Sequence, residues 1–357
     1  MKILLLKFRN IGDVLLSTPL VNNLRHHYPN AQIDFCVNKE TEAMLTLNPN
    51  LNKIITYDRI AIKSLTSIKR LWRELQFIRS FKKENYDVVI NLTSGDRGNL
   101  IAWISNATTR IGYSNKSWFF RKSLTHELPK QELRHTVDAN LDSLRLLNIP
   151  ISNKLVEIFW NSKDEQAISS ELTNINNFIH LHPVSRWLFK CISDNIMAQI
   201  IDYCQLNIGL KVVITASEDK FEVEKVNKIL SLTKSKPINL SGKLSLKETA
   251  ALNKKAKLFI GVDTSIMHIS ASNNVPVLAF FGPSGACHWG PWDNSIATSG
   301  YSRIKGFQVM GMHRVFSESR PCQPCGKDGC DGTKISDCLM NLDFEKIKSN
   351  IVEMLDD

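Results

Sequence analysis

The sequence predicts an α/β protein built from two doubly wound domains, and three observations lead to this fold class. Apolar runs of strand length alternate with segments of helical spacing, which is typical of parallel sheets covered by helices on both faces. The alternation occurs twice, with a polar stretch at residues 155–177 between the two series. The chain has 357 residues, 43% of them hydrophobic, which suits two domains with separate cores.

The first series begins with the apolar run at residues 2–8, which we interpret as the first strand. Further strands are expected at 31–38, 52–58 and 86–93, and helices at 13–29, 40–49, 65–84 and 136–147. In the segment 65–84 the apolar residues recur every three or four positions, which predicts an amphipathic helix. They are Leu65, Ile68, Leu71, Leu75, Ile78 and Phe81.

The second series follows the same pattern. Strands are expected at 177–183, 210–217, 257–263 and 275–282, and helices at 193–207, 219–230, 246–256 and 264–273. We therefore expect an N-terminal domain over 1–160, a second domain over 161–340, and a C-terminal helix within 341–357. Each domain should be Rossmann-like.

The chain is basic, with a formal net charge of +10 and an isoelectric point near 9.1. Such a charge favours anionic partners such as phosphorylated substrates, anionic lipid or nucleic acid, although it can also serve solubility alone. Basic residues gather in and before the segment 65–84, where they form either a solvated face or a surface for an anionic acceptor or acidic lipid. Nucleic acid is not expected, because few aromatic residues are interleaved with these bases.

The sequence predicts no membrane-spanning helix. The uninterrupted apolar run before Lys7, residues 3–6, is only four residues long, too short for the core of a signal peptide. No apolar run approaches the roughly 18–20 residues that a spanning helix needs. We therefore expect a cytoplasmic protein that rests on the inner surface of the membrane.

Ligands of open α/β sheets bind at the carboxyl ends of the strands, so polar residues that follow strands are the first candidates. Asp13 follows the first strand and begins a helical segment. It is either an N-terminal capping residue or a general base that takes a proton from a substrate hydroxyl.

A second candidate is the segment 260–271, where a buried strand passes into a helix. Asp263, Thr264 and Ser265 stand at that transition, and His268 lies one turn after Thr264. Free backbone N–H groups and the helix dipole favour a phosphate at such a position. The alternative is ordinary helix capping with a buried, hydrogen-bonded histidine.

A third candidate is the segment 180–195. Ser185, Arg186 and Lys190 supply donors and positive charge beside Trp187, which would suit a diphosphate leaving group. The alternative is a solvated loop. The glycine- and proline-rich segment 280–292, which follows another strand, predicts an unusual, shaped loop.

The eight cysteines fall into two groups. Cys36, Cys191, Cys204 and Cys287 are scattered, and we expect them to be small buried hydrophobes in a reducing compartment. Cys322, Cys325, Cys330 and Cys338 are closely spaced, which predicts either a structural zinc site or a loop with free or paired thiols.

Four segments together resemble the lipopolysaccharide core heptosyltransferases of glycosyltransferase family 9. They are "KFRNIGDVLLSTPL", "HPVSRWLFKCISDN", "GVDTSIMHISASNNVPVLAFFGP" and "CQPCGKDGCDGTKISDCL". Their joint order is more specific than any one of them. The last segment most resembles the heptosyltransferase III branch.

This resemblance implies a GT-B fold, in which two Rossmann-like domains face each other across a cleft. It implies inverting transfer of heptose from ADP-heptose to the lipopolysaccharide inner core, with no cofactor required for catalysis. The acceptor would bind the first domain and the donor the second, while the C-terminal helix would pack back on the first domain. Another nucleotide sugar, such as an N-acetylhexosamine donor, and a non-catalytic anion-binding module are the alternatives.

The resemblance also assigns roles to residues. Asp13 matches the base and Lys190 the lysine that neutralises phosphate, while Asp263 and Thr264 match donor contacts, with Ser265, His268, Ser185 and Arg186 beside them. Glu222 would contact the nucleotide ribose. The expected acceptor contacts are Lys63, Lys69, Arg70, Asp96 and Arg97.

Overall fold

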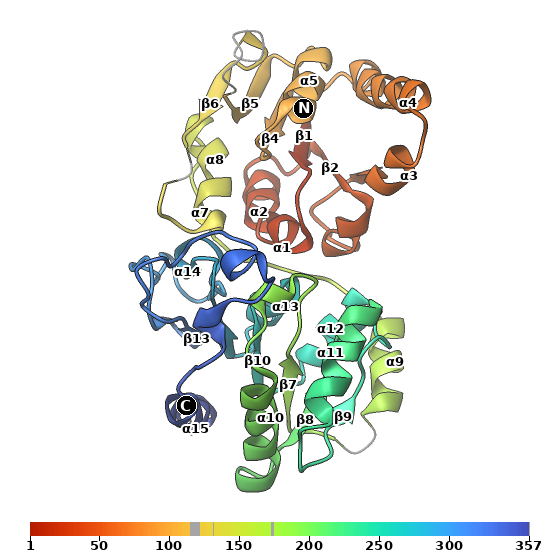
Figure 1. Ribbon diagram of the computed structural model, residues 1–357. Helices are drawn as coiled ribbons and strands as arrows, with labels where there is room; N and C mark the ends of the chain where they lie inside the picture. Colours follow the sequence, from red (N-terminus) through yellow and green to blue (C-terminus); the bar gives the residue numbers. More distant parts are fainter. Residues whose placement is uncertain (115–121, 131, 173–174, 357) are drawn as a thin grey trace. The chain divides into compact units, whose positions relative to one another are not determined.

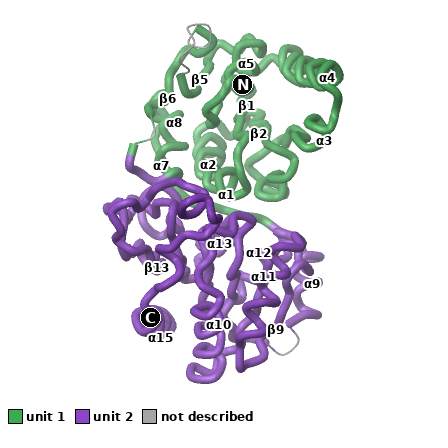
Figure 2. Tube along the Cα trace, viewed as in Figure 1, with its two compact units in different colours: residues 1–132, 136–159 green, residues 133–135, 160–357 purple. Residues whose placement is uncertain are grey.

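The computed structural model describes residues 1–356 apart from 115–121, 131 and 173–174 (Figure 1). The chain forms two compact units (Figure 2). The first contains residues 1–132 and 136–159, and the second contains 133–135 and 160–357. The change from the first unit to the second after Phe159 falls next to the expected boundary at residue 160, and the second unit extends beyond 340 to the chain end.

The first unit contains a six-stranded sheet in which every strand pair is parallel. Its strands are β1 (Lys2–Lys7), β2 (Gln32–Asn38), β3 (Lys53–Tyr57), β4 (Val88–Asn91), β5 (Thr109–Tyr113) and β6 (His126–Leu128), in the order β3-β2-β1-β4-β5-β6. The helices are α1 (Ile11–Leu15), α2 (Thr18–His27), α3 (Arg59–Lys63), α4 (Ser67–Ser80), α5 (Asp96–Ile104), α7 (Thr136–Asn140) and α8 (Asp142–Leu146), with 3-10 turns η1 (Lys39–Met44) and η2 (Phe81–Lys83). Residues 3–7 of β1 are all buried, as expected for a central parallel strand with both faces covered.

The second unit repeats this strand order. Its sheet runs β12-β13-β11-β10-β7-β8-β9, formed by β7 (Phe178–His182), β8 (Lys211–Ile214), β9 (Ile238–Asn239), β10 (Leu258–Val262), β11 (Val277–Phe280), β12 (Gln308–Met310) and β13 (His313–Phe316). Only the edge pair β12–β13 is antiparallel within the described residues. Counted from β7, the parallel strands have the arrangement 3-2-1-4-5-6 of a doubly wound fold, as in the first unit.

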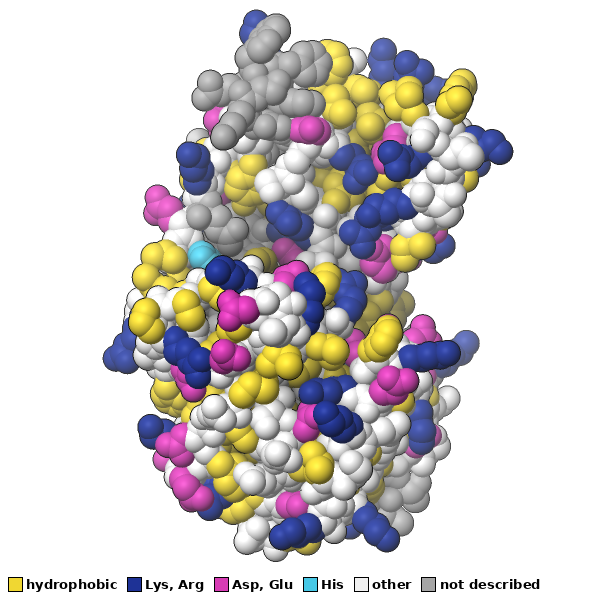
Figure 3. Space-filling view, viewed as in Figure 1, with side chains coloured by type: hydrophobic (Ala, Val, Ile, Leu, Met, Phe, Trp, Pro, Cys, Tyr) yellow, Lys and Arg dark blue, Asp and Glu magenta, His cyan; other side chains and the backbone are white. Residues whose placement is uncertain are grey.

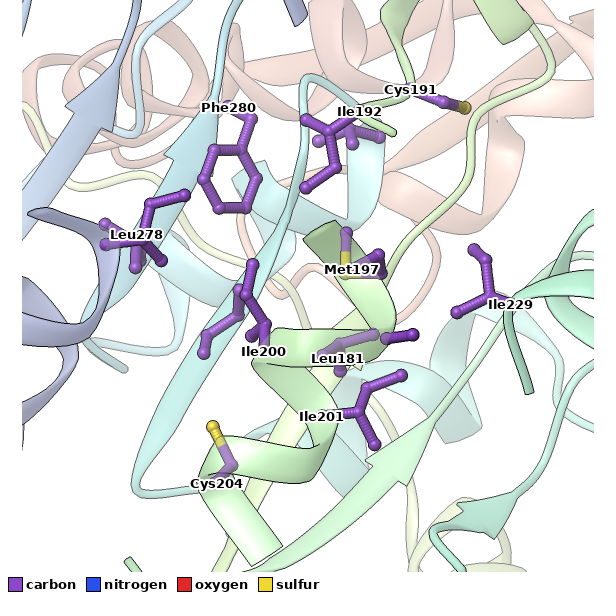
Figure 4. Close-up of a cluster of buried hydrophobic side chains, with 14 of the residues drawn as sticks. Leu181, Cys191, Ile192, Met197, Ile200, Ile201, Cys204, Ile229, Leu278 and Phe280 are labelled. Atoms are coloured by element: carbon purple, nitrogen blue, oxygen red, sulfur yellow. The ribbon is translucent and has the colours of Figure 1, made fainter. Parts of the chain in front are cut away.

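Helices cover this second sheet (Figure 1). They are α9 (Ser162–Glu171), α10 (Asp194–Asp202) with the π-helical turn η4 (Tyr203–Asn207), α11 (Lys220–Leu230), α12 (Leu246–Asn253), α13 (Ser265–Ser272), α14 (Ala286–Trp289) and α15 (Phe344–Asp356), with 3-10 turns η3 (Leu188–Lys190), η5 (Cys330–Gly332) and η6 (Asp337–Leu339). Met197, Ile200 and Ile201 of α10 pack with Leu181 of β7 and Phe280 of β11 in the core shown in Figure 4. The four scattered cysteines are buried, as predicted.

The C-terminal helix α15 belongs to the second unit. The expectation that this helix also packs back on the first domain stays a prediction. Ile347, Ile351 and Met354 lie one helical turn apart and are buried in the same core as α10. Because this stripe supplies the buried side chains of α15, burial against the second unit fixes the position of the helix.

Candidate active site

The carboxyl ends of three neighbouring strands of the second unit carry the polar residues that the sequence singled out. β10 pairs in parallel with β7 on one side and β11 on the other, with Gly261 beside His182 and Val262 beside Phe280. The segments that follow these strands therefore begin at the same edge of the sheet. The strand order reverses between β7 and β10, which is where a ligand binds in folds of this kind.

Lys190, Asp263 and Ser284 form a connected cluster at this edge. The Lys190 Nζ atom lies 2.6 Å from Asp263 Oδ2, and Ser284 Oγ donates to the same oxygen at 2.5 Å. Burial by itself raises the pKa of the Asp263 carboxyl, but the Lys190 charge and the two hydrogen bonds outweigh it and hold that pKa below its usual value. Asp263 is thus a buried, ionised acceptor, and Lys190 is held beside it.

The start of α13 adds two polar atoms that the protein leaves unused. Thr264 is the N-cap residue and His268 lies one turn into the helix. Thr264 Oγ1 and His268 Nδ1 are buried and have no hydrogen-bond partner among the described residues. Burial lowers the pKa of His268 to about 4, so its imidazole is neutral at pH 7. Unsatisfied buried polar groups next to a charged cluster are typical of a site that binds a polar ligand.

The remaining predicted donor contacts, Ser185, Arg186 and Glu222, each have a local contact within the second unit. Ser185 is buried and its hydroxyl accepts from the backbone N–H of Trp187 at 3.2 Å. The exposed Arg186 guanidinium lies 4.9 Å from the Trp187 ring centroid. Glu222, in the first turn of α11 after β8, is buried, and its carboxylate accepts from the backbone N–H of Ser217 at 3.0 Å. A role for Glu222 in ribose binding stays a prediction.

The first unit has the same kind of edge between β1 and β4. The segments after these strands are joined by Phe8 N–H to Thr93 Oγ1 and by Arg9 to Ser94 Oγ, both at 2.8 Å. Asp13 lies in the first turn of α1, where its half-exposed carboxylate accepts from the backbone N–H of Asn10 at 3.3 Å. The N-cap of α1 is Asn10, and Asp13 is the third residue of the helix, where its carboxylate forms a capping box with Asn10. The role of Asp13 as a base stays a prediction, since a capping carboxylate can also accept a proton.

Lys7 is a buried residue of this edge that the sequence analysis did not single out. Its ammonium donates to Leu92 O at 3.1 Å and to Asn140 Oδ1 at 3.0 Å. Burial lowers the pKa of Lys7 to about 8, while the nearby Asp13 carboxylate acts in the opposite direction. The sequence signal for Lys7 is a single lysine at the end of the apolar strand at residues 2–7.

The sequence analysis also does not single out Ser284, although it predicts an unusual loop over the segment 280–292 that contains this residue.

The expected acceptor residues are not brought together by the structure as one polar site. Arg97, in the first turn of α5, pairs with Glu74 of α4 at 2.9 Å, donates to Tyr57 Oη at 2.9 Å and lies 4.1 Å from the Tyr57 ring. Arg97 thus fastens α4 to the end of β3. The exposed Lys63, Lys69 and Arg70 lie on α3 and α4, while Asp96 begins α5. Contacts of these residues with an acceptor stay predictions.

The prediction of a structural zinc site is not supported. No group of three or more metal-ligating side chains is arranged for a metal in the part of the chain that the structure describes. Cys322 is exposed, whereas Cys338 is buried in the hydrophobic core of the second unit. Burial raises the pKa of the Cys338 thiol to about 11, which disfavours the thiolate that binds metals. Close spacing in the sequence therefore does not bring these sulfurs into a metal-binding arrangement.

Comparison with known proteins decides the family. Residues 74–308 match the profile of glycosyltransferase family 9 (heptosyltransferase). The chain belongs to this family. A lipopolysaccharide heptosyltransferase 3 from Escherichia coli is 30% identical over 292 residues, which cover 80% of this chain and 84% of the relative. This family 9 chain is therefore a glycosyltransferase, and its predicted likeness to the heptosyltransferase III branch is confirmed.

Solved structures confirm the fold class of this family 9 chain. A glycosyl transferase family 9 structure from Veillonella parvula has a TM-score of 0.79 at 22% identity and covers 99% of this chain and 97% of its own. The E. coli ADP-heptose heptosyltransferase II has a TM-score of 0.75 at 17% identity, with 99% and 98% covered. These matches show the fold, and the predicted GT-B class is correct.

Proposed function

We propose that this family 9 chain transfers L-glycero-D-manno-heptose from ADP-heptose to a heptose of the lipopolysaccharide inner core. The observation that carries the proposal is the 30% identity to a lipopolysaccharide heptosyltransferase 3 over 80% of the chain. The buried cluster at the β7–β10 edge supports it, because that edge offers charge and unused polar atoms where a doubly wound fold binds a nucleotide.

The second unit is the proposed donor site. The backbone N–H groups at the start of α13, with Thr264 and Ser265, would bind the diphosphate. Asp263, ionised and buried, would accept hydrogen bonds from hydroxyls of the heptose. Lys190 would stabilise the charge that develops on ADP as the bond from the anomeric carbon to the phosphate oxygen breaks. Ser185, Arg186, Glu222 and His268 are the other proposed donor contacts.

Acceptor activation is assigned to Asp13 of the first unit. The acceptor hydroxyl loses its proton to the Asp13 carboxylate as its oxygen forms the new bond to the anomeric carbon. ADP leaves with the electron pair of the broken bond, and attack from the opposite face inverts the anomeric centre. Lys63, Lys69, Arg70, Asp96 and Arg97 are the proposed acceptor contacts. This chemistry requires no resident cofactor.

The proposed enzyme works at the cytoplasmic face of the inner membrane, where a lipid-linked acceptor would be presented. Among the described residues no helix is long and apolar enough to cross a membrane. We therefore propose peripheral association, which the basic character of the chain would favour on anionic lipid.

Release of ADP from ADP-heptose in the presence of purified inner-core acceptor tests the function, with the product identified by mass spectrometry. Asp13→Asn should lower turnover by about 10²–10⁴-fold, because it removes general-base assistance. ADP binding should be unchanged.

Asp164→Asn is the matched control, because Asp164 occupies the same third position of an Asn-capped helix in α9. If Asp13→Asn stays within twofold of Asp164→Asn, Asp13 is not the base. ADP-heptose binding without ADP release would instead favour a binding module, and release from a different nucleotide sugar would replace the donor.

A further inference from the structure

Helix α4 presents an apolar stripe to solvent. Ile68, Leu71, Trp72 and Leu75 follow the spacing of one helix face and are 78%, 61%, 71% and 41% exposed. Soluble proteins rarely expose such a row, and an exposed tryptophan within it is costly in water. The stripe therefore points to a partner.

The helix is fastened to the first unit by another part of its surface. Ile78 and Phe81 are buried in a hydrophobic core that also contains side chains of β1 and β4, and Phe77 packs against the same core. Glu74 pairs with Arg97 at 2.9 Å. Since these contacts lie to one side of the stripe, α4 is held in place while the stripe stays uncovered.

Positive charge surrounds the apolar stripe. Residues 59–83 contain eight Lys or Arg and one acid, Glu74, whose carboxylate is already occupied by Arg97. The exposed bases include Arg73 and Arg79 on α4 itself. In Figure 3, hydrophobic and basic side chains lie side by side over this part of the first unit. A helix with an apolar face and a basic polar face is suited to lie flat in the headgroup region of a bilayer.

We propose that α4 is the membrane-docking element of this chain, with the apolar stripe inserted between the headgroups of an anionic bilayer and Arg73 and Arg79 on lipid phosphates. A second copy of the chain fits this surface poorly. A symmetric dimer through the stripe would bring the same basic residues of both copies together, and this like-charge contact opposes association. The inference deepens the membrane association in the proposed function by naming the surface that carries it.

Vesicle flotation of the full chain tests the assignment. The wild type should bind phosphatidylglycerol/phosphatidylcholine vesicles and bind pure phosphatidylcholine far more weakly. Leu71→Ser should weaken binding by about tenfold, because the apolar side chain no longer leaves water. Leu206→Ser is the matched control, since Leu206 is 60% exposed in the second unit, and it should bind as the wild type does.

Charge and depth are tested separately. Arg73→Gln/Arg79→Gln should weaken binding about fivefold per charge, whereas the exposed pair Lys220→Gln/Lys236→Gln should leave it unchanged. Trp72→Phe should bind normally but lose most of the blue shift in tryptophan emission that the wild type shows on vesicles. Equal binding by the Leu71→Ser and Leu206→Ser variants, or equal binding to both lipids, would overturn the proposal.

The oligomeric state of the lipid-free protein tests whether a second copy of the chain is the partner. If the lipid-free wild type is a dimer by light scattering and Leu71→Ser makes it a monomer, a second copy covers the stripe and the proposal is wrong.

Enzyme activity without a membrane separates the docking proposal from the proposed function. ADP release with a water-soluble, delipidated acceptor should be the same in the wild type and Leu71→Ser. If the wild type does not release ADP in that reaction, the proposed function is wrong, whereas the result of the vesicle experiment is unaffected.

Discussion

Lys190 and Asp263 follow neighbouring strands on the two sides of the point where the strand order of the second unit reverses. The ion pair with Lys190 offsets the desolvation free energy of burying the Asp263 carboxylate, and Ser284 donates a second hydrogen bond to it. A diphosphate would bring further negative charge to this edge. Lys190 would then face both anions, while its bond to Asp263 keeps its ammonium in position.

Replacing Lys190 by Met should weaken ADP binding by about 10- to 100-fold, because a charge-assisted contact with phosphate is lost. Isothermal titration with ADP measures this. Lys225→Met is the matched control, because Lys225 pairs with Asp194 on α10 and is 24% exposed, against 23% for Lys190. If the two variants bind ADP equally, Lys190 serves only the ion pair and not the donor.

Single residues show how far sequence reasoning reaches. Asp263 and Lys190 could be predicted as site residues because they follow apolar strands, and a position after an apolar strand can be recognised from the sequence. The pairing of Arg97 with Glu74 was not foreseen, because a basic residue after a strand looks the same whether its partner is a ligand or its own chain. Ser284 was missed for the converse reason, since a serine in a loop carries no sign that a buried carboxylate lies beside it.

For helix α4 the sequence predicted the helix itself but not which of its apolar residues are buried. The spacing of apolar residues predicted a helix over 65–84, and α4 occupies Ser67–Ser80 within it. Spacing alone says that an apolar face exists, whereas burial depends on what the fold places against it. Only Ile78 of α4 is buried. The segment 13–29 was predicted as one helix but forms α1 and α2, with a break at Leu16 and Ser17 before Pro19, which suits the first turn of a new helix.

The Arg97–Glu74 pair should determine how firmly α4 is held. Arg97→Met removes the ion pair and the contact with the Tyr57 ring, which together should cost about 1–2 kcal/mol of local stability. Amide hydrogen exchange of residues 67–80 should accelerate accordingly. Arg79→Met, at an exposed position of the same helix, should leave exchange unchanged. Unchanged exchange in Arg97→Met would show that the Arg97–Glu74 pair does not hold α4. A raised KM for the acceptor in the same variant would separately support the proposed acceptor contact of Arg97.

At the scale of the whole molecule, both units share the strand order of a doubly wound sheet, and the alternation of apolar runs predicted this class. The central strands were found because both of their faces are buried, so that almost every residue is apolar. The missed strands lie toward the edges of the sheets. In β5, β6, β9, β12 and β13, short or more polar segments of two to five residues leave little periodicity to detect.

The buried histidines of the second unit should make it the acid-sensitive part of the molecule. Burial lowers the pKa of His182 to about 3 and keeps that of His180 far below its usual value, and both rings contact Thr215 Oγ1. His268 behaves similarly, with a pKa of about 4. An unfolded histidine titrates near pH 6.5, so below that pH the unfolded chain binds protons that the folded unit does not. The free energy of unfolding therefore falls as the pH drops from about 6.5 toward 4.

Each of these three histidines contributes a loss of up to about 1.4 kcal/mol per pH unit in that range. The lowered pKa of Asp263 acts in the same direction at lower pH, because its ion pair is lost when the carboxyl is protonated. In the first unit, Lys7 has a pKa of about 8, so it is protonated throughout this range and adds no slope. Hydrogen exchange at pH 7 and pH 5, corrected for intrinsic rates, should show accelerated opening of β7, β10 and α13 and a smaller change in β1 and β4. Equal acceleration in both units would show that general charge repulsion, and not these buried imidazoles, governs acid unfolding.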